Sequence, residues 1–368
     1  MTMSPLPTLE SPQFQESGLC ELPNAASMYE KILQAEARAV QDGANENVML
    51  VRVVGHPLLE LHAKRGIFGN RPCETIIDEV IPSSTGHGDG DNVVFEVGRR
   101  YRDHLICRFR TSTEPYRYPP PSSHPSRPSY DKTAKEKALA RDDFQCMITG
   151  SFDETSVKHN AELQAREKDL GGRPTVVEAC HILSESTTQG VGASEESSVV
   201  NKTHYAPGVL AILTQFGLER LAKALEAVNG VHEVWNLLSL EPHIHADFDS
   251  LKLWFESTDE PNRYEICFFN VTIGRYIRAI SIRPETSGPN AKMVDNFSSD
   301  WEGAPPPDPK LLALHATCAR VAHMSGAAEF LDDLERQAEE TDVLAFDGSS
   351  AHLLSGLISP YAVIYGVA

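Results

Sequence analysis

The chain of 368 residues is about twice as long as a typical single domain, which favours two domains or one large domain with additions. Hydrophobic residues make up 41% and charged residues 23%, and no apolar run approaches the ~20 residues of a membrane helix, so we expect a soluble protein without a membrane partner. The formal net charge of −19 excludes a surface that binds nucleic acid everywhere, because such binding depends on Lys and Arg at phosphates.

The charge is unevenly distributed along the sequence. Residues 99–141 hold eleven basic and four acidic residues, whereas residues 329–347 hold eight acidic residues and one basic residue. The basic block either lines a nucleic-acid groove or forms a solvated face. The acidic block predicts a solvated C-terminal region that could meet a protein partner.

The N-terminus and the cysteines indicate the compartment. The first residues lack the basic and apolar regions of a secretory signal, so we do not expect a secreted protein. Seven cysteines are spread along the chain without a CxxC pair, which is typical of reduced thiols. We therefore expect an intracellular protein, in the cytosol or the nucleus.

The first third of the chain predicts a small N-terminal unit. Residues 1–25 are rich in Pro, Ser, Glu and Gln, which predicts a disordered leader. An apolar stripe predicts a helix over 26–41. Runs rich in β-branched and aromatic residues predict strands over 48–55, 92–98 and 103–112. We therefore expect an α/β, β-rich unit over 26–114.

Residues 115–130 are rich in Pro and Ser and predict an extended linker before a second domain over 131–284. A charged helix over 131–143 is expected to open this domain, and a helical insertion over 204–230 to interrupt it. Residues 285–368 are expected to form a C-terminal helical region with an acidic segment, its helices lying between 310 and 337. The strands expected within the second domain are 144–150, 174–183, 250–257, 263–272 and 275–284.

Three short motifs of the second domain carry chemical groups in a suggestive order. CMITG (146–150) is followed by EACHIL (178–183) and, after Asn236, by HADFD (245–249). A histidine at the end of a strand, a later asparagine, and a histidine beside a carboxylate on a helix suit hydrolysis of a phosphodiester with one divalent metal.

Each of these residues has a chemical reason to be there. His181 can accept the proton of water, because a neutral imidazole has a pKa near ambient pH. His245 and Asp249 are spaced i, i+4, so on a helix they share one face and can reach a common ion. The Asn236 amide can either hydrogen-bond across the loop that precedes it or reach the metal as an oxygen ligand. His243 is expected to be a loop residue.

The ordered pattern C-x-x-T-G, A-x-H-I-L, N-x-L-x-L and H-x-x-F-D over about residues 141–255 resembles the HNH endonuclease superfamily, particularly the variant common in fungal proteins. The resemblance implies an α+β protein with a ββα-metal (His-Me finger) core, here with a long helical insertion. It also implies His181 as the general base, Asn236 as the middle asparagine, His245 as the last histidine, and Asp249 as a helix residue near the metal.

Cys180 departs from the pattern of the resembled family, in which Asp or His before the base often binds the metal. A thiol suits zinc better than magnesium. Three arrangements follow: fewer protein ligands (Asn236, His245 and Asp249), Glu178 in place of the missing ligand, or a zinc-like ion bound by Cys180. With the family in mind we expect one divalent ion, Mg²⁺ or Mn²⁺ before Zn²⁺.

The sequence thus predicts a metal-dependent endonuclease that acts on nucleic acid, DNA rather than RNA. The alternative is a catalytically degenerate HNH-fold binding or interaction module, which Cys180 and the overall charge favour. A third hypothesis is a zinc-dependent hydrolase of another substrate that uses Cys180, His245 and Asp249.

Overall fold

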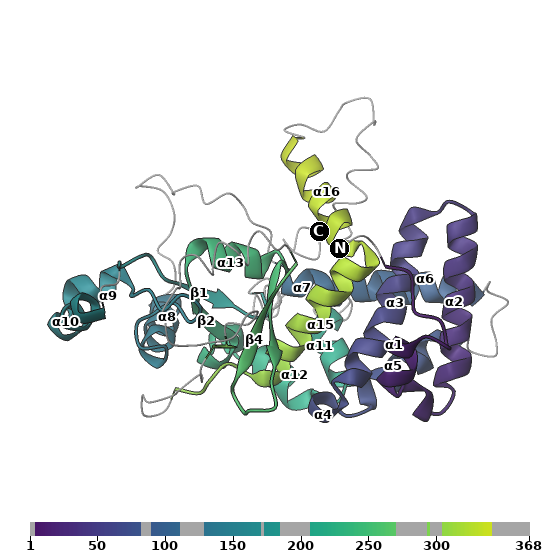
Figure 1. The fold of residues 1–368 in the computed structure, drawn as a ribbon, viewed down its shortest axis with the longest axis horizontal. Coiled ribbons are helices and arrows are strands. Elements are labelled where there is room, and N and C mark those ends of the chain that lie inside the picture. Colours follow the sequence, from purple (N-terminus) through teal and green to yellow (C-terminus); the bar gives the residue numbers. More distant parts are fainter. Residues whose placement is uncertain are drawn as a thin grey trace, which may run out of the picture. The chain divides into compact units, whose positions relative to one another are not determined.

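A computed structural model describes residues 4–81, 90–110, 129–170, 173–184, 207–269, 293–294 and 304–340 (Figure 1). Helices dominate and the strands are short, which is an α+β architecture. Every helix in these ranges is too short or too polar to cross a membrane.

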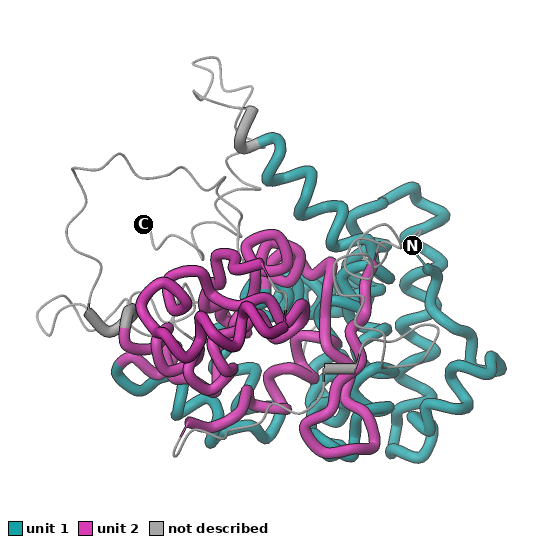
Figure 2. The backbone as a smooth tube through the Cα atoms, turned by 60° about the vertical axis from the view of Figure 1, so that its left-hand side comes forward, with its two compact units in different colours: residues 1–109, 186–228, 317–368 teal, residues 110–185, 229–316 magenta. Residues whose placement is uncertain are grey.

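The backbone divides into two compact units, both built from separate stretches of chain (Figure 2). Unit 1 comprises residues 1–109, 186–228 and 317–368, and unit 2 comprises residues 110–185 and 229–316. The helices expected within the insertion therefore group with the N-terminal residues rather than with the motifs on either side of them.

Unit 1 is helical throughout the part that the structure describes. Its α2 and C-terminal helices agree with the predicted positions. Its elements are α1 (Pro12–Ser17), η1 (Leu19–Glu21), α2 (Ala25–Gln41), α3 (Asn45–Ala63), α4 (Arg65–Phe68), α5 (Arg71–Val80), α6 (Gly90–Tyr101), the π-helical turn η2 (Arg102–Ile106), α7 (Cys107–Phe109), α11 (Pro207–Gln215), α12 (Glu219–Glu226), the C-terminal half of α15 (Pro309–Ser325) and α16 (Ala327–Glu340).

The prediction of a β-rich N-terminal unit is wrong. Residues 48–55 lie in α3, residues 92–98 lie in α6, and residues 103–109 form helical turns. Residue 110 belongs to no helix or strand, and 111–112 fall outside the described residues. The eleven residues from Val48 to Leu58 are all buried, so this stretch of the helix has no solvent-exposed face to give a 3.6-residue period of polar residues. A Cβ on Gly98 would meet the Leu50 carbonyl oxygen at 2.3 Å, which shows how closely α3 and α6 pack.

Residues 4–25, expected to be part of a disordered leader, are folded in the structure. The Ser11 hydroxyl accepts a hydrogen bond from the Phe14 amide and caps α1, which ends at Gly18 in the left-handed region (φ 70°). Leu6 and Phe14 are 5% and 1% exposed. A few large apolar anchors fix a segment whose composition is otherwise polar.

Unit 2 contains the motifs. Helix 131–143 and the strands near 178–181, 253–257 and 264–268 are confirmed, while residues 144–150 form a turn that ends at Gly150 (φ 72°) instead of a strand. Most of the predicted linker and the strand expected over 275–284 lie outside the described residues. Its elements are α8 (Ser129–Arg141), α9 (Glu154–His159), α10 (Ala161–Leu170), β1 (Glu178–His181), η4 (Gly230–His232), η5 (Val234–Asn236), β2 (Leu237–Leu240), α13 (Pro242–Asp249), β3 (Leu253–Ser257), β4 (Tyr264–Phe268), β5 (Met293–Val294) and the N-terminal half of α15.

Strand β1 and helix α13 carry Glu178, Cys180, His181, His245 and Asp249, and β2 joins them. β1 pairs with β2 so that Glu178 faces Leu240 and His181 faces Leu237. α13 follows β2 after one residue, begins with Pro242 in its first turn, and contacts β1 and β3. The strands β3, β4 and β5 form a second antiparallel sheet.

Several arginines of the basic block are internal. Arg102, Arg108, Arg110 and Arg141 are only 3–6% exposed. The Arg141 guanidinium donates to the Val234 carbonyl (2.7 Å), to the Leu237 carbonyl (2.9 Å) and to the carboxylate of its neighbour in sequence. These four side chains are buried and do not contribute to a basic surface, and Arg141 joins its helix to the segment around Val234 and Leu237.

We predict that Arg141→Met destabilises the protein. The substitution leaves two buried carbonyls and the Asp142 carboxylate without their donor, which costs on the order of 3–5 kcal/mol of unfolding free energy. Chemical denaturation measures the loss, with Lys137→Met on the exposed face of the same helix as the control, expected within about 0.5 kcal/mol of wild type. Equal stability of the two variants would show that Arg141 does not hold these elements.

Candidate metal and catalytic site

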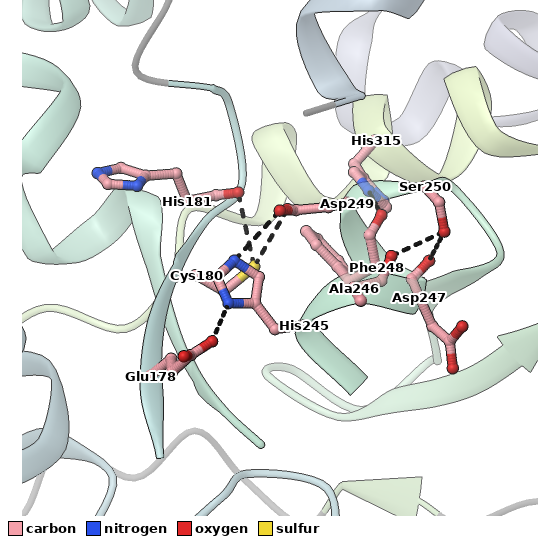
Figure 3. Close-up of polar contacts among 10 residues, drawn as sticks. All are labelled: Glu178, Cys180, His181, His245, Ala246, Asp247, Phe248, Asp249, Ser250 and His315. Atoms are coloured by element: carbon pink, nitrogen blue, oxygen red, sulfur yellow. Dashed lines mark hydrogen bonds and ion pairs between the residues drawn. The ribbon is translucent and has the colours of Figure 1, made fainter. Parts of the chain in front are cut away.

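The local structure places four acidic or coordinating side chains together. Residues two apart in a strand point to the same face, so Glu178 and Cys180 share one face of β1. Residues four apart in a helix share a face, so His245 and Asp249 project together from α13. Figure 3 shows that the two pairs point toward one another.

Cys180, His245 and Asp249 each offer one ligand atom, and these atoms lie within 4.8 Å of one another. The His245 Nε2 is 3.3 Å from Asp249 Oδ2, and the Cys180 thiol donates to Asp249 Oδ1 at 3.7 Å. The Cys180 side chain is fully buried, whereas those of His245 and Asp249 are 22% and 13% exposed. Solvent therefore reaches part of this group.

Glu178 contacts the nitrogen of His245 that faces away from Cys180 and Asp249. Its Oε2 lies 2.8 Å from His245 Nδ1 (Figure 3). Because a carboxylate accepts, Nδ1 carries the proton and Nε2 is the nitrogen directed at Cys180 and Asp249. Glu178 thus contacts the His245 nitrogen opposite the one that faces Cys180 and Asp249, and it lies outside the group of three possible ligands.

The protons of this group are held tightly. Burial raises the pKa of the Cys180 thiol to about 12. For His245, burial opposes the charged form, but the acidic groups around it, Cys180, Asp249 and Glu178, more than compensate and raise its pKa. A cation that enters the group must therefore displace protons from the sulfur and the imidazole.

The donor set fits a divalent metal. Sulfur, nitrogen and oxygen from three side chains, with part of the group open to solvent, are typical of zinc sites that keep a position for water or substrate. A carboxylate on the far nitrogen of a coordinating histidine is the usual second partner in such sites, and Glu178 occupies that place.

Asn236 lies outside this donor group. It is fully buried, its amide nitrogen donates to the carbonyls of Leu183 (3.0 Å) and Val231 (2.8 Å), and its oxygen accepts from the Leu183 amide (3.0 Å). These bonds correspond to the first of the two roles considered for it, holding the loop against the strand that carries His181.

His181 lies on the other side of β1 from Cys180, as alternation along a strand requires. In Figure 3 its ring extends away from Cys180, His245 and Asp249. Its Nε2 is 3.2 Å from Nδ1 of His232, and the two rings meet edge to face at 5.3 Å between centroids. Our sequence reasoning missed His232. Its place four residues before Asn236 was the one available signal.

Two further histidines lie on or against α13. The prediction of a loop position for His243 is wrong: it is the second residue of α13, because Pro242 begins the helix directly before it. It lies beside Glu241 (3.6 Å) and outside the donor group. His315 stacks on Phe248 with the ring planes 1° apart and 3.8 Å between centroids, and its Nε2 donates to the Phe248 carbonyl (3.3 Å). Burial lowers the pKa of His315 to about 3, so the ring is neutral near pH 7. This contact fixes the helix turn that carries Asp249.

The comparisons agree with the sequence resemblance over the same residues. A family model described as HNH endonuclease matches residues 146–256, which span β1, β2, α13 and most of β3. Searches of curated proteins and of solved structures each found no match. The match over residues 146–256 therefore supports the HNH endonuclease superfamily for this stretch of the chain.

Proposed function

We propose that the protein is a metal-dependent endonuclease in which β1, β2 and α13 act as a ββα-metal core. The observation that carries this proposal is the convergence of Cys180, His245 and Asp249, from two elements far apart in sequence, on one point inside the family-matched domain. Structural packing alone does not require a buried thiol and two carboxylates around one imidazole.

Each side chain then has a defined task. Cys180, His245 and Asp249 would hold one divalent ion, and a bound ion stabilises the negative charge that gathers on the phosphate and the leaving oxygen. Glu178 keeps the His245 Nε2 turned toward the ion. His181 takes the proton of the attacking water, and Asn236 holds the segments on either side of it in place.

The donor set argues for a softer ion than the family resemblance does. Magnesium prefers oxygen ligands in octahedral geometry, whereas a thiolate with an imidazole and a carboxylate suits zinc or cobalt. We therefore propose Zn²⁺, which the sequence had placed behind Mg²⁺ and Mn²⁺, as the resident ion.

We propose DNA as the substrate, cut without sequence readout, in an intracellular setting. The support for the setting is that none of the seven cysteines, all of which the structure describes, forms a disulfide, as expected where thiols stay reduced. Support for a nucleic-acid substrate comes from the family match. The basic residues add little support, because several of the arginines expected to form a basic surface are buried.

A second candidate is an interaction module without catalysis. The observation that favours it is the direction of the His181 ring, which extends away from the donor group. In this case the metal site would stabilise the domain. The exposed acidic residues of α16, such as Asp332 and Asp333, would face a protein partner.

We predict that the purified protein nicks plasmid DNA with zinc, cobalt or manganese and that His181→Ala slows cutting by about 10²–10⁴-fold while metal binding persists. His245→Ala should lose both DNA cutting and metal binding, because it removes a ligand of the ion. His159→Ala, at the exposed end of α9, is the matched control and should behave as wild type. If the wild-type protein binds metal in calorimetry but cuts no DNA, the interaction module without catalysis is the correct function.

We also predict that Cys180→Asp changes the metal preference. Wild type with cobalt should show a near-ultraviolet thiolate-to-metal absorption and bind zinc far more tightly than magnesium. The variant should lose this absorption and bind zinc at least about tenfold more weakly, because an oxygen replaces the sulfur. Cys20→Ser, which alters an exposed thiol, should keep the absorption. If the thiolate-to-metal absorption persists in Cys180→Asp, Cys180 is not a ligand of the ion.

A further inference from the structure

His181 and His232 form a direct imidazole pair. The distance between Nε2 of His181 and Nδ1 of His232 is 3.2 Å, which is a hydrogen bond, so one nitrogen donates and the other accepts. Both side chains are partly exposed. The pair therefore lies where a substrate could reach it.

The contact is built by the fold. His232 ends the short helix η4, which starts after Asn229 in the left-handed region (φ 61°). The buried Asn236 amide donates to Val231, the residue before His232, and bonds twice to Leu183, two residues after His181. The Asn236 side chain thus hydrogen-bonds to both segments that carry the histidines. The backbone adds a hydrogen bond from the Ile182 amide to the Asn236 carbonyl (2.9 Å).

The chemistry proposed for His181 decides which ring donates. A general base must present a lone pair to water. Since Nε2 of His181 is engaged by His232, the lone pair has to be at Nδ1, and Nε2 must carry the proton that it donates to His232. In the reaction, an O–H bond of water breaks and its proton joins Nδ1 of His181, while the hydroxide oxygen bonds to phosphorus. The bond from phosphorus to the leaving oxygen breaks at the same centre, and that oxygen departs with the electron pair and takes up a proton from solvent. The Nε2–H bond stays intact.

We infer that His232 is the positioning residue of the base: its Nδ1 accepts a hydrogen bond from Nε2 of His181 and fixes the ring orientation and the tautomer in which Nδ1 carries the lone pair. This inference rests on the proposed nuclease function. An acceptor behind a catalytic histidine has the same task in hydrolases that use a carboxylate there, and a neutral imidazole performs it here.

Two substitutions separate positioning from packing. His232→Leu removes the acceptor and keeps an apolar side chain, whereas His232→Asn restores an oxygen near the place of Nδ1. We expect His232→Leu to lower kcat by about 10–100-fold with KM within about twofold of wild type, and His232→Asn to recover most of the loss. In a His181→Ala background, His232→Leu should have no further effect, because the group it positions is gone.

Selective ¹⁵N labelling of histidine in the full chain gives a readout apart from cleavage. The His181 signals should report Nε2–H in wild type and in His232→Asn, and a mixture of tautomers in His232→Leu. His159→Leu serves as the matched control and should change neither kcat nor these signals.

The outcomes distinguish the inference from the proposed function. If the wild-type protein cuts no DNA, the proposed nuclease function is wrong. The tautomer signals then still show whether His232 orients His181. An unchanged kcat in His232→Leu, an equal loss in the His181→Ala background, or an unaltered tautomer would each overturn the inference.

Discussion

The pairing of β1 with β2, locked by the Asn236 amide, is the constraint on which the site depends. The register that sets His181 opposite Leu237 also turns Glu178 and Cys180 toward the helix that follows β2. Because strand residues alternate between faces, a shift by one residue would exchange Cys180 for His181 in the donor group. The hydrogen bonds of Asn236 to Leu183 and Val231 oppose such a shift.

Protons balance the acidic groups of the site, and a bound ion would have to replace them. Its thiol and imidazole retain protons, and the carboxylates of Glu178 and Asp249 lie against the same ring. Buried polar groups at such density are expensive unless they are paired or bound to a metal. The neutral His315 beneath Phe248 adds no charge to this region, so the helix is supported by stacking and one hydrogen bond.

Sequence reasoning succeeded where chemistry is encoded locally. The i, i+4 spacing of His245 and Asp249 predicted their common face, and ordered motifs indicated the family. It failed where packing decides. The apolar run of α3 has no helical period because the helix is buried nearly all round, and the polar leader is fixed by Leu6 and Phe14. The internal arginines and the contact of His232 depend on tertiary neighbours that no short pattern reveals.

X-ray absorption at the zinc edge of the loaded protein tests the central claim most directly. If Cys180, His245 and Asp249 hold one ion, the spectrum should contain one sulfur at about 2.3 Å and nitrogen or oxygen ligands at about 2.0–2.2 Å. The sulfur should vanish in Cys180→Asp while the other ligands remain. A shell of oxygen and nitrogen alone in the wild-type protein, or no bound zinc, would contradict the account.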